Sequence, residues 1–373
     1  SKYVGDIFGS ALAAEGIFAF ALESGFLGIL LFGWHRVSPK VHYFSTIMVF
    51  LGSMFSAVWI VVANSWQQTP AGFHIVGEGM KARAEITDFW AMVFNPSSMD
   101  RLTHVWIGSF LSGAFLVLSV NAYYILRKKH LEIAKPSFKI ALFIATFFSF
   151  AQLATGHKSA DGVAVNQPAK LAALEGHYDS SAAADMYLLG WVDNKNQKVT
   201  GLKIPGGLSF LLHQDFKKPV TGLNAFDPNN RPTQVNAIFQ VYHIMIAIGM
   251  FLIALTAYAS WLLYKGKLFE QKWLMHVFAW SVFLPQIANQ AGWFAAEMGR
   301  QPWVVYGLLR TSDALSKTVK ANQIVFSLIL FGLVYLTLFA LFIYLLNKKI
   351  KHGPGSAHET GDIHSNREER IIV

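Results

Sequence analysis

The chain contains 373 residues, of which 53% are hydrophobic and only 14% are charged. Its long uncharged runs are typical of a polytopic membrane protein and exclude a soluble enzyme, which could not cover so much apolar surface. The absence of cysteine excludes disulfides, thiolate metal sites and covalently attached c-type haem. The formal charge of +9 comes from basic runs that flank the apolar segments, so it indicates membrane topology rather than nucleic-acid binding.

The apolar runs predict an all-α fold, a membrane bundle of about seven transmembrane helices. Four spans make up an N-terminal membrane part, residues 1–156, and three make up a C-terminal membrane part, residues 236–347. A long extracytoplasmic loop, 157–235, separates them, and a tail, 348–373, follows. The spans are expected near 10–33, 44–63, 104–126, 137–156, 236–264, 274–296 and 322–346.

Basic residues mark one side of this predicted bundle. They follow the first, third, fifth and seventh spans, and the positive-inside rule assigns that side to the cytoplasm. The start of the chain is then expected outside and its tail inside. These residues are Arg36 and Lys40, then Arg127, Lys128, Lys129 and Lys135, then Lys265, Lys267 and Lys272, and last Lys348, Lys349 and Lys351.

The long loop is rich in Gly, Pro, Asn and Asp and is predicted to be mostly irregular. Loops of this length are usually functional or mobile. Near its start, Lys170 and Glu175 lie five residues apart, a pattern that an ordinary solvated loop also explains. After Lys351 the mixed-charge tail is predicted to be disordered.

Two carboxyl groups lie inside the first predicted span. Glu15 and Glu23 are eight residues apart, about 12 Å along a helix and ~80° around it, so both can line one side. Inside a membrane such groups are expected to be protonated, paired, or part of a proton route or haem site. The alternative is a neutral carboxyl group bonded to a neighbouring helix, although two on one helix are hard to explain by packing.

Candidate haem ligands occur in the third and fifth spans. His104 opens the third span, where it could instead anchor the helix end at the membrane interface. His243 and Met245 lie two residues apart in the fifth span, about 200° around the axis, so one haem could use only one of them. His/Met ligation of a low-spin haem is well established. Spacing alone leaves both His104/His243 and His104/Met245 open.

The sixth span is unusually polar. It carries Pro285, Gln286, Asn289 and Gln290, with Glu297 seven residues later on the same face. Such a helix is expected to face a cavity, a cofactor or another subunit, with polar contacts between helices as the alternative.

The stretch from Gly299 to Thr311, Gly-Arg-Gln-Pro-Trp-Val-Val-Tyr-Gly-Leu-Leu-Arg-Thr, places two arginines between apolar runs. An unpaired charge at membrane depth costs roughly 3 kcal/mol or more, so Arg300 and Arg310 need anionic partners. A porphyrin propionate is one such partner.

These features together resemble subunit I of the cytochrome bd quinol oxidases, and the likeness runs through all seven spans. The most specific stretches are Tyr-Val-Gly-Asp-Ile-Phe-Gly at 3–9, Leu-Gly-Ser-Met-Phe-Ser-Ala-Val-Trp-Ile-Val-Val-Ala-Asn-Ser-Trp at 51–66 and Gly-Arg-Gln-Pro-Trp at 299–303.

The resemblance implies a role for each candidate residue. It implies that His104 and Met245 are the ligands of a low-spin haem b, and that Arg300 and Arg310 lie against haem propionates. The two first-span acids, Glu15 and Glu23, would serve the high-spin haems and proton delivery. The quinol-loop pair of the family falls on Lys170 and Glu175.

The implied activity is that of the haem-binding subunit of a terminal oxidase. Quinol would be oxidised at the outer face and oxygen reduced to water with cytoplasmic protons, which generates a proton-motive force. Further expected cofactors are a high-spin haem b and a haem d or third haem b. Expected partners are subunit II and a small single-span subunit, without nucleic acid, in the bacterial cytoplasmic (inner) membrane.

Three departures from the family pattern stand out. This chain begins where the third span of the family begins, so an apolar span carrying a histidine is expected upstream of Ser1. Gln290 stands where a glutamate ligates a high-spin haem, so the expectation is either that Glu297 or Glu15 substitutes or that the haem content differs. His243 replaces an arginine, and the loop is short, as in the cyanide-insensitive oxidases.

Two other functions fit parts of the pattern. A di-haem quinol dehydrogenase would keep His104, Met245 and the loop but would lack an oxygen site. A transporter or structural membrane subunit would keep the spans and the polar sixth helix without needing haem.

Overall fold

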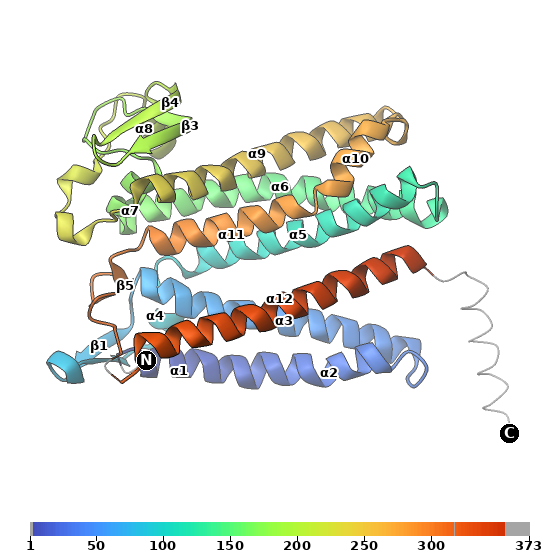
Figure 1. Cartoon of the computed structure of the whole chain (residues 1–373), viewed down its shortest axis with the longest axis horizontal. Helices are drawn as coiled ribbons and strands as arrows, with labels where there is room; N and C mark the ends of the chain where they lie inside the picture. The colour runs from blue at the N-terminus through green and yellow to red at the C-terminus, as the bar shows by residue number, and fades with distance from the viewer. Residues whose placement is uncertain (1–2, 317, 355–373) are drawn as a thin grey trace.

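A computed structural model describes residues 3–316 and 318–354 and confirms a helical membrane bundle (Figure 1). Within these residues, six stretches are long and apolar enough to cross a membrane. The first consists of α1 (Gly5–Ala14), the π-helical segment η1 (Glu15–Phe20) and α2 (Ala21–Phe32). The others are α3 (Pro39–Gln68), α5 (Ser98–Leu126), α6 (Leu131–Asn166), α9 (Val235–Tyr264) and α12 (Ala321–His352).

The sixth predicted span is a broken helix. It consists of α10 (Lys272–Trp280) and α11 (Phe283–Met298), each too short to cross a membrane alone. Pro285 has no N–H to offer the carbonyl of Ser281, and its ring excludes that carbonyl from a regular turn. Leu284 N–H instead donates to Ser281 O at 3.1 Å, and the Ser281 hydroxyl donates to Phe278 O at 2.8 Å. The proline therefore explains why one predicted span consists of two helices.

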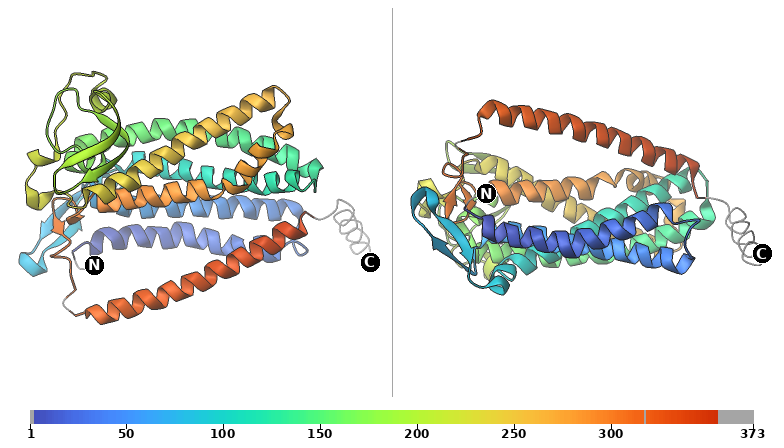
Figure 2. Two further views of the ribbon diagram at one scale, coloured as in Figure 1. Left: turned by 45° about the horizontal axis from the view of Figure 1, so that its top comes forward. Right: turned by 90° about the horizontal axis from the view of Figure 1, so that it is seen from below.

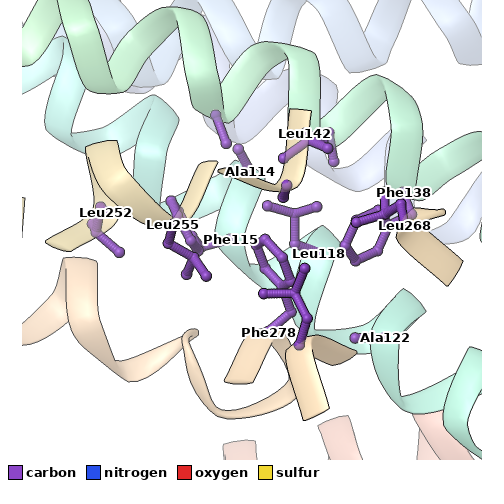
Figure 3. Close-up of a cluster of buried hydrophobic side chains, with 14 of the residues drawn as sticks. Ala114, Phe115, Leu118, Ala122, Phe138, Leu142, Leu252, Leu255, Leu268 and Phe278 are labelled. Carbon is purple, nitrogen blue, oxygen red and sulfur yellow. The ribbon is translucent and has the colours of Figure 1, made fainter. Parts of the chain in front are cut away.

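The core lies between α5, α6, α9 and α10, where large and small apolar side chains interdigitate (Figure 3). Alanines at helix contacts allow the backbones to approach closely, as membrane helices require. Phe115, Phe138 and Phe278 fill the centre of this cluster, and the last two meet edge to face. Labelled members are Ala114, Phe115, Leu118, Ala122, Phe138, Leu142, Leu252, Leu255, Leu268 and Phe278.

Four helices close a ring, since α5 packs on α6, α6 on α9, α9 on α11, and α11 on α5. The first span packs on α3, which in turn contacts α5. Helix α12 stands apart from the other helices in both views of Figure 2. Its apolar window has no buried residue, and near its end the carbonyl of Ile350 accepts a hydrogen bond from the Tyr124 hydroxyl at 2.8 Å.

The short elements gather at the end of the bundle where the N-terminus lies, except η5, which joins α9 to α10 at the opposite end (Figure 1). The long loop is more ordered than the prediction of a mostly irregular segment, because α6 continues to Asn166 and a helix, a hairpin and a second helix follow. The predicted disordered tail falls mostly on residues 355–373, outside the described part.

The short helices are α4 (Phe89–Val93), α7 (Pro168–Leu174) and α8 (Gly207–His213). The antiparallel hairpins are β1–β2 (Phe73–Val76, Arg83–Ile86), β3–β4 (Met186–Asp193, Lys198–Ile204) and β5–β6 (Trp303–Val305, Leu309–Arg310). The 3-10 turns are η2 (Gly79–Lys81), η3 (Leu223–Ala225), η4 (Pro228–Asn230) and η5 (Leu268–Glu270).

Candidate functional site

His104 lies on α5 and its imidazole is held by α6. Nδ1 is 3.1 Å from the hydroxyl of Thr155, which itself donates to Ala151 O. Because that hydroxyl proton is already committed, Thr155 accepts from Nδ1–H and leaves a lone pair on Nε2. The Gln152 amide lies 3.0 Å from Nε2. Nδ1 is thus fixed by a partner, as in a metal-ligating histidine, and Nε2 is the nitrogen that could coordinate once the Gln152 amide is displaced from it.

Met245 lies on α9, at the corner of the helix ring opposite α5. A Cβ atom at Gly292 of α11 would come within 2.8 Å of the Met245 sulfur, so glycine leaves the room that the thioether occupies. His243 faces elsewhere, because its Nδ1 contacts Phe239 O at 2.8 Å and its Nε2 contacts Tyr187 O at 2.7 Å. Both nitrogens of His243 are thus engaged by backbone carbonyls, one of α9 itself and one of β3.

The interior beside His104 fits a haem in a further respect. Ser149 and Gln152 lie one turn apart on α6, and the Ser149 hydroxyl and the Gln152 carbonyl oxygen are buried without a hydrogen-bond partner. Buried polar atoms are rarely left unpaired in a finished site. An imidazole and a thioether on opposite helices, with unpaired polar atoms between helices, suit an iron porphyrin.

Three cations gather where α3, α5, α7 and α11 meet. Arg300 pairs with Glu297 and donates to Gln67 Oε1 at 3.2 Å. Arg101 donates to Asn64 Oδ1 at 2.8 Å, and the Asn64 amide donates to Glu297 Oε1 at 2.9 Å. We refer to Arg101, Lys170, Arg300 and Glu297 as the cation cluster.

Lys170 completes the cation cluster from inside the protein. Its Nζ donates to Gln68 Oε1 at 3.0 Å and to Gln167 Oε1 at 3.3 Å, and the residue is only 3% exposed. Gly299 gives it room, since a Cβ atom there would lie 3.0 Å from the Lys170 side chain. Burial, then the charges of Arg101 and Arg300, lower the pKa of Lys170 well below its usual range. Three cations surround one carboxylate, so the cluster suits an additional anion.

Glu175 does not pair with Lys170. It is also 3% exposed, but its neighbour is the Tyr242 hydroxyl of α9, and its Oε2 has no hydrogen-bond partner. Burial raises the pKa of Glu175 to about 7, while the bond from Tyr242 opposes the increase. The two residues predicted as one quinol pair therefore occupy different environments.

Glu15 and Glu23 both face α3, as their spacing predicts. Ser56 donates to Glu15 Oε1 at 2.6 Å, and Ser53 donates to Glu23 Oε1 at 3.2 Å. The π-helical segment brings them closer in direction than an α-helix would. The wide turn takes up about one extra residue, so the eight-residue step rotates by about 20° instead of ~80°.

The remaining predicted residues lie at the edges of the ring. Gln290 is exposed on α11, whereas its neighbour Asn289 contacts α5, donating to Ser112 Oγ at 3.1 Å. Arg310 donates to Asn229 O at 3.0 Å and to Asn230 Oδ1 at 2.5 Å, and it lies over the Trp303 ring. Arg310 thus holds the end of the long loop, and it shares Trp303 with Arg300, which donates to Trp303 O at 3.3 Å.

Sequence reasoning missed several members of the site. Arg101 precedes His104 by three residues, so the two share one face of α5, and this spacing was a usable signal. Tyr242 gave no signal, because only the folded loop places it beside Glu175. The polar side chains Asn64, Gln67, Gln68 and Gln167 were missed as well.

Comparisons with known proteins show the family of the chain. A family model described as cytochrome bd terminal oxidase subunit I matches residues 1–354. The chain is 35% identical over 363 residues to "Cytochrome bd ubiquinol oxidase subunit 1" of Bacillus subtilis (strain 168), covering 95% of this chain and 77% of that protein. It is 31% identical to the cytochrome bd-II ubiquinol oxidase subunit 1 of Escherichia coli (strain K12), covering 95% and 82%. A chain of the bd oxidase structure from Geobacillus thermodenitrificans superposes with a TM-score of 0.83 at 30% identity, covering 95% and 80%. The chain therefore belongs to the cytochrome bd terminal oxidase subunit I family.

Proposed function

We propose that this chain is the haem-binding subunit of a terminal respiratory oxidase that oxidises membrane quinol at its outer face and reduces oxygen to water with cytoplasmic protons. The similarity to bd oxidase subunits over 95% of the chain supports this activity over a quinol dehydrogenase or a structural subunit. Opposite sides for proton release and uptake would generate a proton-motive force.

The observation that carries the proposal is the placement of His104 and Met245 on opposite helices of the ring, α5 and α9. Thr155 fixes Nδ1 of His104, and Gly292 leaves room for the Met245 thioether. Nε2 of His104 meets only the Gln152 side-chain amide, which a low-spin haem b could displace, whereas both nitrogens of His243 face backbone carbonyls, so we propose Met245 as the second ligand. Bound haems, the low-spin haem b, a high-spin haem b and a haem d or third haem b, supply electron transfer and oxygen chemistry.

The cation cluster would hold carboxylates of the porphyrin. Arg101 and Arg300 supply two positive charges, Glu297 balances one of them, and the buried Lys170 amine, whose pKa is lowered, would gain its charge beside an added anion. Arg101 and Lys170 are placed by Asn64, Gln68 and Gln167, so their hydrogen-bond donors are already oriented. We assign Lys170 to this cluster and leave Glu175 as the group that meets quinol. Glu297 already bonds to Arg300 and Asn64, which supports a charge-balancing role over iron ligation.

Glu175 is suited to accept a proton from quinol. Its pKa of about 7 means that it can take up a proton and release it near neutral pH, and one of its oxygens is free to accept. On the other side of the bundle, Glu15 and Glu23 of the first span accept hydrogen bonds from Ser56 and Ser53 of α3. These side chains can pass protons inward along the contact between the two helices.

We propose two partners. One is an integral subunit II, which family membership supports, and the other is a small single-span subunit. The proposed orientation places the short elements of Figure 1 outside and the basic loops in the bacterial cytoplasm. Quinol and oxygen are the proposed substrates.

The test is an absorption difference spectrum of the chain purified with its partner. We expect a reduced low-spin b signal that His104→Ala abolishes, together with loss of quinol-driven oxygen uptake. His276→Ala is the matched control, because His276 is exposed on α10 and bonds only to Lys272 O among described contacts. A normal low-spin signal in His104→Ala would remove His104 from the site. Quinol oxidation without oxygen uptake in the unmodified complex would instead favour a dehydrogenase.

A further inference from the structure

The β3–β4 hairpin has an apolar inner face that packs against α9. Val192 and Val199 are buried there with Phe239. Gly190 allows the close approach, since a Cβ atom at this position would lie 3.3 Å from Val199 and 3.6 Å from the Phe239 ring. The hairpin is therefore fixed to the membrane helix rather than standing free.

The outer face of the same hairpin is apolar too. Leu189 and Trp191 are 61% and 65% exposed, and Leu202, which pairs with Leu189 across the strands, is 61% exposed. An antiparallel hairpin that faces water on one side normally alternates apolar and polar residues. A solvated hairpin would not carry large apolar side chains on both sides of its pleat, Val192 and Val199 inside and Leu189, Trp191 and Leu202 outside.

Three polar contacts align β3 with the first turns of α9. Val192 N–H donates to Asn236 Oδ1 at 3.1 Å, and the Gln240 amide donates to Gly190 O at 2.8 Å. His243 contacts Tyr187 O at 2.7 Å. The strand thus runs antiparallel to the helix, and from Asn236 to His243 it descends about 10 Å.

This descent crosses the expected membrane boundary. Helix α9 has 30 residues, about 45 Å, whereas the hydrocarbon core is about 30 Å thick. At the far end of α9, Tyr258 and Trp261 form an exposed stacked pair of the kind found at membrane interfaces. Counting about 20 residues back from this pair reaches the neighbourhood of residue 240. The hairpin lies beside that point, as Figure 1 shows.

Polarity along the hairpin follows the same direction. The hairpin turn, from Asp193 to Lys198, is polar. It lies beside the first turn of α9, where Asn236 N–H donates to Asn194 Oδ1 at 3.0 Å. At the opposite end, α8 packs where Gly207 meets Met186 and Ile204. It carries the exposed Phe210, which stacks on the exposed Phe216 just after the helix. Residues 186–218 contain five lysines and two aspartates. Such a surface suits anionic lipid headgroups.

We propose that the β3–β4 hairpin and α8 are inserted into the lipid leaflet on the loop side, with Leu189, Trp191, Leu202, Phe210 and Phe216 in contact with lipid. The apolar face continues the lipid-facing surface of α9, where Ile244 and Met250 are exposed. The long loop is then a membrane-embedded element that meets the same lipid phase in which a quinol dissolves.

The chain has no cysteine, so single cysteines can report the depth of each position without removing native ones from it. The intact complex, with cysteine-free partners, is placed in vesicles of phosphatidylethanolamine and phosphatidylglycerol. A nitroxide is attached at Leu189→Cys, Leu202→Cys or Phe210→Cys. Met250→Cys is the lipid reference and Asn196→Cys, in the exposed hairpin turn, is the aqueous reference. The measurement is the collision rate of the nitroxide with dissolved oxygen and with a water-soluble nickel chelate.

We expect the oxygen-to-nickel ratio at 189, 202 and 210 to approach that at 250 and to exceed that at 196 several-fold. Ratios equal to that at 196 would overturn the proposal, because the face would then be solvated. Protection from both reagents with an immobilised spectrum would also overturn it, since a protein partner would then cover the face. Two positions on the hairpin and one on α8 keep the test valid if one variant does not assemble. The result is independent of oxidase activity.

Discussion

At the scale of single residues, the most informative contrast is between Lys170 and Glu175. They are five residues apart and equally buried, yet each has its own partners. Burial lowers the pKa of Lys170 and raises the pKa of Glu175 to about 7, so both changes disfavour the charged form. Had they formed an ion pair, each would have favoured the charge of the other. We infer two separate roles, one in holding an anion and one in moving a proton.

Tyr242→Phe tests the proton role. The Tyr242 hydroxyl lowers the pKa of Glu175, so its removal leaves burial unopposed and raises that pKa above about 7. The carboxylate form is then depleted at acidic pH, and the acidic limb of quinol oxidation moves to higher pH. We expect a roughly threefold loss of rate near pH 6.5 and little change near pH 8.5, measured as kcat against pH.

Tyr258→Phe is the matched control, because Tyr258 lies at the far, lipid-exposed end of α9. A Tyr242→Phe profile that coincides with the control across the pH range would show that Glu175 does not set the acidic limb. Unchanged haem spectra in both variants would confirm that the shift does not arise from a damaged fold.

At the scale of elements, the glycines of the ring decide how close the helices and ligands come. Gly292 on α11 faces the Met245 sulfur, and Gly156 on α6 faces His104, where a Cβ atom would lie 3.4 Å from the imidazole. The first contact is far tighter than the second. A methyl group added at Gly292 would therefore disturb Met245 more than one added at Gly156 would disturb His104.

Gly292→Ala is expected to displace the thioether, because the new Cβ atom would lie 2.8 Å from the sulfur. Methionine ligation raises the potential of a haem, so we expect a lower midpoint potential and a weaker low-spin signal in a redox titration. Gly249→Ala, one turn from Met245 and with open space around it, is the control. Alanine favours a helix over glycine, so a loss at 292 cannot reflect helix propensity. Equal potentials in the two variants would place the sulfur away from the iron.

At the scale of the whole molecule, α12 is an appendage of the ring rather than part of it. None of its apolar window is buried, and Tyr124 to Ile350 is a contact near its end. The ring of α5, α6, α9 and α11 and the cation cluster are complete without it among the described residues. Lipid or a partner subunit is the natural environment of such a helix.

A chain that ends after Ser316 is therefore expected to keep the low-spin b signal when it is expressed with its partner. It retains both candidate ligands, the cation cluster and the bond from Arg310 to the loop. The measurement is the difference spectrum of isolated membranes, with His104→Ala in the full-length chain as the negative control. Loss of the signal on truncation would show that α12 supports the ring.

The sequence was sufficient for the helices, but not for the grouping of the candidate site residues. Apolar runs predict the spans, because lipid forces every backbone group to bond within its own segment. The break at Pro285 and the extension of α6 to Asn166 depend on local hydrogen bonds that hydropathy does not report. Spacing left His243 and Met245 equivalent, and only the contact of His243 with Tyr187 separates them. The association of Lys170 with Arg300 instead of Glu175 arises from tertiary packing of α7.

The cation cluster has a consequence for the order of assembly. Arg101 and Arg300 belong to membrane helix ends, whereas Lys170 arrives on α7, the short helix that follows α6. Docking α7 buries the Lys170 amine beside two arginines and one carboxylate, so its positive charge must be lost or repelled there, and this opposes closure. We expect the porphyrin to enter before α7 docks, because its carboxylates remove that repulsion. Newly made chains without haem would then expose α7 and the loop that follows it to proteases, and haem binding would protect both segments.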